Sequence, residues 1–172
     1  MAIFKTANRK GKYHDDASRT DVLRYILQEY KIPHNLFRGY NFYVPMENPE
    51  AAVAYYAAVM DATAARFKKE KGVKLRHFIF SFMPHEVSDP ILAEQIAQRL
   101  ACFYQKEYET VYAVHEDTRN LNIHIVINAV SYVDGHRYGG TRMEHHSFLN
   151  HAKFVLREYG INVWYQSNKD VS

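Results

Sequence analysis

The sequence is poor in the features that mark membrane-spanning and secreted proteins. None of its apolar runs approaches the roughly 20 residues of a membrane helix. The opening residues, MAIFKTANRKGK, lack the apolar core of a signal peptide. The one cysteine, Cys102, excludes a disulfide framework within the chain and suits a reducing compartment. We therefore expect a cytoplasmic protein without membrane insertion.

Strong net charge, internal repeats and linkers are also missing. With 47% hydrophobic and 24% charged residues, the 172-residue chain has a globular composition, which excludes disorder as its main state. We expect a single domain over residues 1–172, either a whole protein or the N-terminal domain of a longer one. A net charge of +3 is too small to indicate nucleic-acid binding by itself. The 14 tyrosines and 10 phenylalanines either stack on unpaired bases or fill the core.

The most informative stretch is TVYAVHEDTRNLNIHIVINAV, from Thr110 to Val130. Its two halves, residues 111–115 and 121–130, are rich in β-branched and aromatic residues. Asp-Thr-Arg-Asn at 117–120 is turn-forming. The pattern predicts an antiparallel β-hairpin.

A turn centred on residues 118–119 places His115 opposite Asn122. Because side chains alternate along a strand, Asn122 and His124 share one face, and His115 joins them at a Cβ separation of about 5 Å. The other face is expected to carry Ile123, Ile125 and Ile127. Isolated histidines on strands are usually bystanders, whereas a cluster with Asp117 beside it favours a metal site.

The remaining elements alternate along the chain. We expect strands at 2–7, 42–44, 75–83 and 161–165, and helices from Ser18 or Thr20 to 29, from 49 to 69, after Asp89, and from 143 to 159. Ile91 and Phe103 are expected on the buried face of the third helix. The fold class is α+β, a central antiparallel sheet covered by helices on one face.

Three motifs resemble those of the plasmid mobilisation relaxases, members of the HUH endonuclease superfamily. HEDTRNLNIHIVINAV resembles their third motif, except that Asn122 stands where the family usually has a histidine. The resemblance implies a palm-like sheet and a divalent metal held by His115, His124 and Asn122. An amide oxygen among the ligands favours Mg²⁺ or Mn²⁺ over Zn²⁺.

The first and second motifs supply the other expected site residues. TDVLRYILQE resembles the first motif, which makes Tyr25 the DNA-cleaving nucleophile; by pattern alone, Tyr13 and Tyr30 are equal candidates. LRHFIFSFMPHE resembles the second motif, which places Ser81 close to DNA. Asp117 is expected to orient a metal-binding histidine or to accept the tyrosine's proton.

Basic residues are densest between positions 66 and 76, either as a solvated helix end or as a surface that follows phosphates. We expect Lys74, Arg76 and Arg119 to contact DNA.

The implied function is strand-specific nicking and rejoining of DNA at a transfer origin through a 5′-phosphotyrosyl intermediate. The expected partners are single-stranded origin DNA, accessory relaxosome proteins and a coupling protein. Two alternatives stay open: a rolling-circle replication initiator, and a non-catalytic single-stranded DNA-binding domain in which Asn122 marks a degraded metal site.

Overall fold

The structure is a computed structural model that describes residues 1–8 and 12–167. Its strands are β1 (Ala2–Thr6), β2 (Phe37–Tyr40), β3 (Leu75–Phe82), β4 (Thr110–His115), β5 (Leu121–Asn128) and β6 (Val163–Tyr165). Its helices are α1 (Ser18–Ile26), α2 (Pro49–Arg66), α3 (Pro90–Ala101) and α4 (Arg142–Arg157), with a 3₁₀ turn, η1, at Glu29–Lys31. Among the described residues, no helix combines the length and apolarity needed to cross a membrane.

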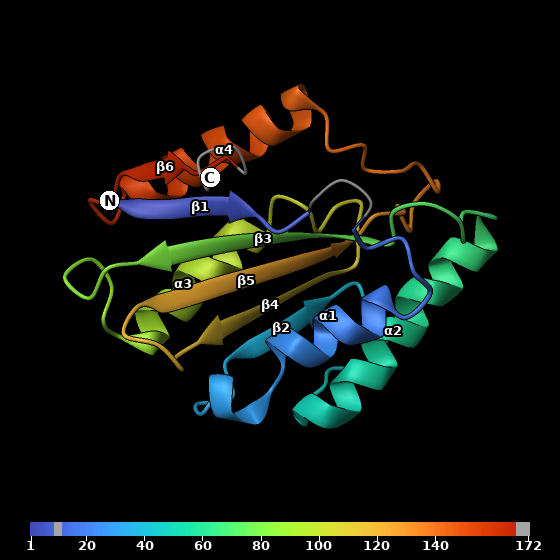
Figure 1. The fold of residues 1–172 in the computed structure, drawn as a ribbon, viewed down its shortest axis with the longest axis horizontal. Coiled ribbons are helices and arrows are strands. Elements are labelled where there is room, and N and C mark those ends of the chain that lie inside the picture. Colours follow the sequence, from blue (N-terminus) through green and yellow to red (C-terminus); the bar gives the residue numbers. More distant parts are fainter. Residues whose placement is uncertain (9–11, 168–172) are drawn as a thin grey trace.

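The strands form one six-stranded sheet in the order β2-β4-β5-β3-β1-β6 (Figure 1). Neighbours pair antiparallel except β1 and β6, which run parallel at the edge. The α+β class is confirmed, and the sheet is mixed at that edge. The predicted hairpin register is also confirmed, since His115 pairs with Asn122.

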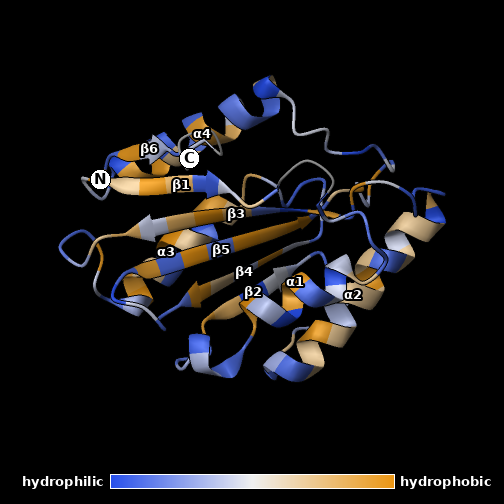
Figure 2. Ribbon diagram, in the orientation of Figure 1, coloured by the Kyte–Doolittle hydropathy of each residue, from blue (hydrophilic) through white to orange (hydrophobic). Residues whose placement is uncertain are grey.

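Helices cover both faces of the sheet, so the expectation of one covered face was wrong. Ile123, Ile125 and Ile127 lie in a core cluster with residues of α3 and α4. Val111 and Val126 point the other way, into a second cluster with α1 and α2. Figure 2 shows the hydrophobic character of the central strands. Both faces are covered because β4 and β5 carry apolar residues on each of their two faces. Strands of sheets that are buried on both sides show this pattern.

Local signals explain which helix boundaries could be predicted. Asp89 caps α3 by accepting a hydrogen bond from the backbone of Ile91 at 2.9 Å, as its position before Pro90 indicates. By contrast, α1 begins at Ser18 without a side-chain cap and ends at Ile26, three residues early. The chain then turns through η1, whose last residue is Lys31.

Two further expectations were wrong. The second strand covers Phe37–Tyr40, not residues 42–44, because backbone pairing with β4 sets its position. Ile91 and Phe103 are exposed rather than buried, because the buried side of α3 is formed by its alanines together with Ile96 and Leu100.

Candidate active site on the α1 face of the sheet

Tyr25 lies beside two strand histidines. It is the penultimate residue of α1, whose buried stripe of Leu23 and Ile26 packs against the sheet. The Tyr25 ring centroid is 5.9 Å from that of His115 and 5.8 Å from that of His124. With 45% of its surface exposed, Tyr25 remains accessible to a substrate. The structure therefore brings Tyr25 next to two hairpin histidines that lie far from it in the sequence.

The two histidines are buried and held in fixed orientations. Their ring centroids are 3.9 Å apart, and their exposed fractions are 2% for His115 and 4% for His124. His115 Nε2 lies 2.8 Å from the carbonyl oxygen of Ile26. Since a carbonyl only accepts, Nε2 carries the proton and Nδ1 keeps its lone pair. The same bond ties the end of α1 to β4.

A third histidine, His77 on β3, extends the row and was not among the predicted site residues. Its Nε2 lies 2.9 Å from His124 Nδ1, and its own Nδ1 lies 3.4 Å from the hydroxyl of Tyr13. The alternation of β3 places His77 and Ser81 on one face, but only the pairing of β3 with β5 brings that face to His124. Ser81 pairs with Asn122 in the same register.

The donor atoms at this site suit a divalent cation. Asn122 donates its amide N–H groups to Thr118 Oγ1 at 3.2 Å and to the Asn120 carbonyl at 3.1 Å. Within the described residues, no hydrogen bond engages Asn122 Oδ1, His115 Nδ1 or His124 Nε2. Two imidazole nitrogens and one amide oxygen form a mixed donor set for a metal ion. No group of three or more His, Cys, Asp or Glu suited to a metal occurs among those residues.

A buried lysine lies against Tyr25 and was also missed by the sequence analysis. Lys31 Nζ is 4.2 Å from the Tyr25 ring centroid and 3.5 Å from Asp117 Oδ2. Burial disfavours its charge, but the fields of Tyr25 and Asp117 outweigh burial and raise the pKa of Lys31. Asp117 thus pairs with Lys31, rather than making a hydrogen bond to one of the three histidines. The η1 turn brings Lys31 back over α1, and no helical periodicity signals that turn.

The predicted DNA-binding residues lie at separate places. Lys74 is buried and pairs with Asp16 at 3.0 Å. Arg76 follows Leu75 on β3 and points to the face opposite Tyr25, where its Nη2 donates to the Gly139 carbonyl at 2.9 Å. Arg119 is exposed in the hairpin turn, at the same end of β5 as Asn122.

Comparison with known proteins gives the family. Residues 10–161 match the family described as the MobA/VirD2-like relaxase nuclease domain. The chain belongs to this relaxase family. It is also similar to two proteins named rlx from Staphylococcus aureus, with 28% identity over 111 residues and 31% over 112 residues, each covering 64% of this chain. The matches cover 35% and 34% of those proteins, so the relaxase domain spans about a third of the curated relatives.

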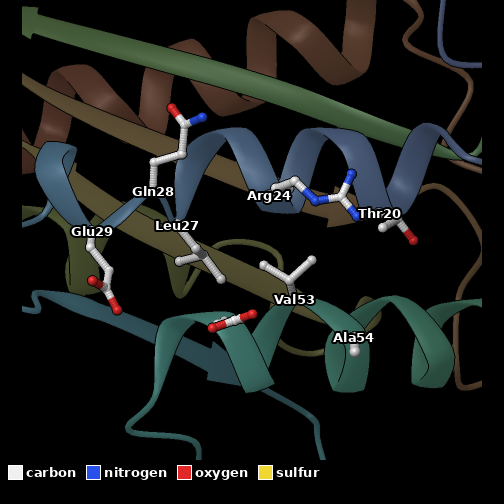
Figure 3. A pocket seen from close by; sticks show the side chains of 8 residues that line it. Thr20, Arg24, Leu27, Gln28, Glu29, Val53 and Ala54 are labelled. Carbon is white, nitrogen blue, oxygen red and sulfur yellow. The ribbon is translucent and has the colours of Figure 1, made fainter.

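The relaxase domain has another hollow beside α1, which is separate from the histidines. This hollow, of about 520 Å³, lies between α1 and α2 (Figure 3). Arg24 and Leu27 face Val53 across it, and neither Tyr25 nor a histidine contributes to its lining. Its size alone therefore does not make it the candidate active site.

Burial keeps the histidine row of the relaxase domain neutral. It lowers the pKa of His124, where the fields of His115 and His77 add to the effect, and it lowers the pKa of His77 to about 3. Burial likewise lowers the pKa of His115, although its bond to Ile26 opposes this. Neutral imidazoles are the form that binds metal ions.

The lowered pKa values predict acid-sensitive folding. The unfolded chain takes up protons below about pH 6.5 and the folded chain resists them, so this stability is complete above that pH and is lost as pH falls. We expect His77 alone to remove about 2 kcal/mol of unfolding free energy between about pH 7 and 4.5. Urea unfolding at several pH values measures this, with His77→Gln as the comparison. Equal pH slopes in the two proteins would contradict the assignment.

Proposed function

We propose that this domain nicks one strand of DNA at a transfer origin and rejoins it, through a covalent bond to Tyr25. The observation that carries the proposal is the position of Tyr25, half-exposed on the last turn of α1 with its ring beside His115 and His124. Membership of a relaxase nuclease family supports the same chemistry. The substrate is single-stranded DNA. Accessory relaxosome proteins and a coupling protein are proposed partners of the complete protein.

The reaction needs a nucleophile that conserves the energy of the broken bond. The Tyr25 oxygen attacks the scissile phosphorus and loses its proton, while the bond from phosphorus to the 3′ oxygen breaks and that oxygen gains a proton. The products are a 5′-phosphotyrosyl link and a free 3′ hydroxyl. Attack by a 3′ hydroxyl on the same phosphorus reverses the step and frees Tyr25.

His115, His124 and Asn122 would hold a divalent ion, Mg²⁺ or Mn²⁺, through three atoms that no hydrogen bond engages within residues 1–8 and 12–167. Such an ion supplies charge stabilisation at a non-bridging phosphate oxygen. His77 would orient the ring of His124: if His77 Nε2 accepts the Nδ1 proton, the lone pair of His124 lies on Nε2. Ser81, paired with Asn122, is proposed to contact the bound strand.

Lys31 is proposed to stabilise the negative charge that Tyr25 carries while its oxygen attacks the phosphorus. Its ammonium group lies against the ring, where the negative charge of a phenolate would be attracted to it. Asp117 holds the ammonium in place from the other side and is proposed to accept the phenol proton. Lys31 itself is 7% exposed, which limits the access of water to its ammonium group.

Removal of the Lys31 charge is expected to slow nicking. We predict that Lys31→Met lowers the rate of adduct formation about 10- to 100-fold, which corresponds to a loss of about 1.4–2.7 kcal/mol in the transition state. Lys31→Arg should retain most of the rate. Lys153 is exposed, and Lys153→Met is the matched control. Equal rates of adduct formation for Lys31→Met and Lys153→Met would refute the proposed role of Lys31.

The proposed function is tested by an adduct assay. The domain is incubated with Mn²⁺ and single-stranded oligonucleotides from the candidate origin of its element, then separated under denaturing conditions and mapped by peptide mass spectrometry. We expect a covalent DNA–peptide species containing Tyr25. Tight binding of the strand without any adduct would favour the alternative of a non-catalytic DNA-binding domain. In that alternative, the asparagine at position 122 marks a degraded metal site.

A further inference from the structure

The α1 face of the sheet is covered over only part of its width. The core cluster under α1 and α2 includes Val111 and Val126, but within residues 1–8 and 12–167 it includes no residue of β1 or β6. In Figure 1, α1 lies in front of the β2–β4 side of the sheet, whereas none of the drawn helices passes in front of β1 and β3. The part of this face from β3 through β1 to β6 is therefore an open surface next to the candidate active site.

The two faces of β1 and β3 differ in burial. On the face toward α3 and α4, Ala2, Phe4 and Phe80 are fully buried in the core. On the open surface, Ile3 and Ile79 are only partly buried and, among the described residues, belong to neither core cluster. Apolar side chains that no helix covers leave this surface available for a ligand.

Backbone pairing aligns the open surface with the candidate active site. Asn122 pairs with Ser81, which in turn pairs with Ile3. Ile3 pairs with Trp164 of β6. Because residues paired in register point to the same face, Trp164 lies on the face of Asn122, three strands away. With neighbouring strands about 4.8 Å apart, this row is about 14 Å long, a length that a few nucleotides span.

Trp164 is the only tryptophan of the chain, and 45% of its surface is exposed. Its neighbours Val163 and Tyr165 pack against the core cluster on the opposite face, so alternation along β6 directs Trp164 to the open surface. A single exposed aromatic residue is common on protein surfaces, but Trp164 ends a row that begins at the candidate active site. An indole ring offers a flat apolar surface on which an unpaired base can stack.

The charge of the open surface suits a phosphate backbone. Lys5 is exposed and pairs with Ile79, which pairs with His124 in the neighbouring row. The strands β1, β3, β5 and β6 contain no aspartate or glutamate. A positive side chain without carboxylates on the same strands attracts the phosphates of a nucleic acid. Positive charge beside a flat apolar surface favours single-stranded DNA as the occupant.

We propose that the open surface binds the DNA strand that flanks the scissile phosphate, with one base stacked on Trp164 and one phosphate paired with Lys5. This inference rests on the proposed function for the identity of its ligand. A strand whose scissile phosphate lies at Tyr25 would cross Ser81 and Ile3 to reach Trp164. The stacked base then fixes the position of the strand relative to Tyr25.

Trp164 is its own probe, because a tryptophan can be excited selectively in the presence of tyrosines. The measurement uses the Tyr25→Phe background, which keeps the oligonucleotide uncleaved. We expect a single-stranded oligonucleotide from the candidate origin to quench the tryptophan fluorescence, and the same strand with abasic sites along its flanks to leave it unquenched. Absence of quenching at saturating strand, or equal quenching by the abasic strand, would overturn the proposal.

Substitution of Trp164 tests the energetic contribution of the stack. We expect Trp164→Ala to weaken oligonucleotide binding about tenfold, as for the loss of one stack between a base and an aromatic ring, and Trp164→Phe to retain most of the affinity. Phe154 is an exposed aromatic residue on α4, and Phe154→Ala is the matched control with unchanged affinity. Fluorescence anisotropy measures binding, and thermal melting verifies that each variant folds. Wild-type affinity in Trp164→Ala would refute the stack.

Lys5 is tested through the salt dependence of binding. Loss of one phosphate contact in Lys5→Gln should lower the slope of log affinity against log salt concentration by about 0.7. Lys153→Gln removes an exposed lysine of α4 and should keep the wild-type slope. Equal slopes for the two variants would remove Lys5 from the binding surface.

The adduct assay separates this inference from the proposed function. Trp164→Ala should raise the oligonucleotide concentration needed for half-maximal adduct formation about tenfold and leave the rate at saturation unchanged, since Trp164 does not touch the reacting atoms. A strand trimmed to the few nucleotides around the scissile phosphate should react equally with both proteins. Quenching and weakened binding with no adduct in wild type would refute nicking alone. A normal adduct with no effect of Trp164→Ala would refute the role of the open surface alone.

Discussion

Tyr25→Phe is expected to abolish the covalent protein–DNA adduct while leaving DNA binding nearly intact. The substitution removes only the hydroxyl oxygen, and among the described residues Tyr25 is the tyrosine with ring contacts to both His115 and His124. Phenylalanine keeps the ring, and therefore the packing against Lys31, His115 and His124. The loss should appear as the absence of a denaturant-resistant complex, with oligonucleotide affinity within about twofold of wild type.

Tyr30 provides the matched control. It lies five residues later, also contacts Lys31 at 5.4 Å from its ring centroid, and is 67% exposed, but makes no ring contact with the histidines. Tyr30→Phe should form the adduct at the normal rate. A normal adduct with Tyr25→Phe would transfer the role of nucleophile to another tyrosine, first of all to Tyr30.

The hairpin could be predicted because its information is local. The turn residues at 117–120 set the register, and the register places His115, Asn122 and His124 on one face. The sequence also carries a signal for helices on both faces of the sheet, because β4 and β5 have apolar residues on both of their faces. The strand at Phe37–Tyr40 was not, because four residues without clear periodicity become a strand only through pairing with β4.

The missed site residues depend on tertiary structure. His77 reaches His124 only because β3 pairs with β5 across a large sequence separation, and no motif states which strands are neighbours. Lys31 reaches Tyr25 because α1 ends early and η1 reverses the chain, whereas continued helix would carry the two residues apart. Spacing in the sequence therefore predicted which hairpin residues share a face, but not which residues of other elements lie beside them.

His124→Ala is expected to weaken Mn²⁺ binding by more than about 100-fold and to reduce nicking to background, because it deletes one of two imidazole donors and leaves His77 without its partner. Isothermal titration of Mn²⁺ in the presence of uncleaved oligonucleotide measures the affinity independently of catalysis. His146→Ala, an exposed histidine on α4, is the control and should bind as wild type does.

Asn122→His replaces an amide oxygen with a third imidazole donor at the position opposite His115. If Asn122 is a metal ligand, this change should raise the affinity for Zn²⁺ more than that for Mg²⁺, because imidazole is the softer donor. If Asn122 serves only the hairpin turn through its bonds to Thr118 and Asn120, both affinities should stay as they are. Unaltered Mn²⁺ binding in His124→Ala would place the ion elsewhere, and the histidine row would then serve to orient Tyr25 alone.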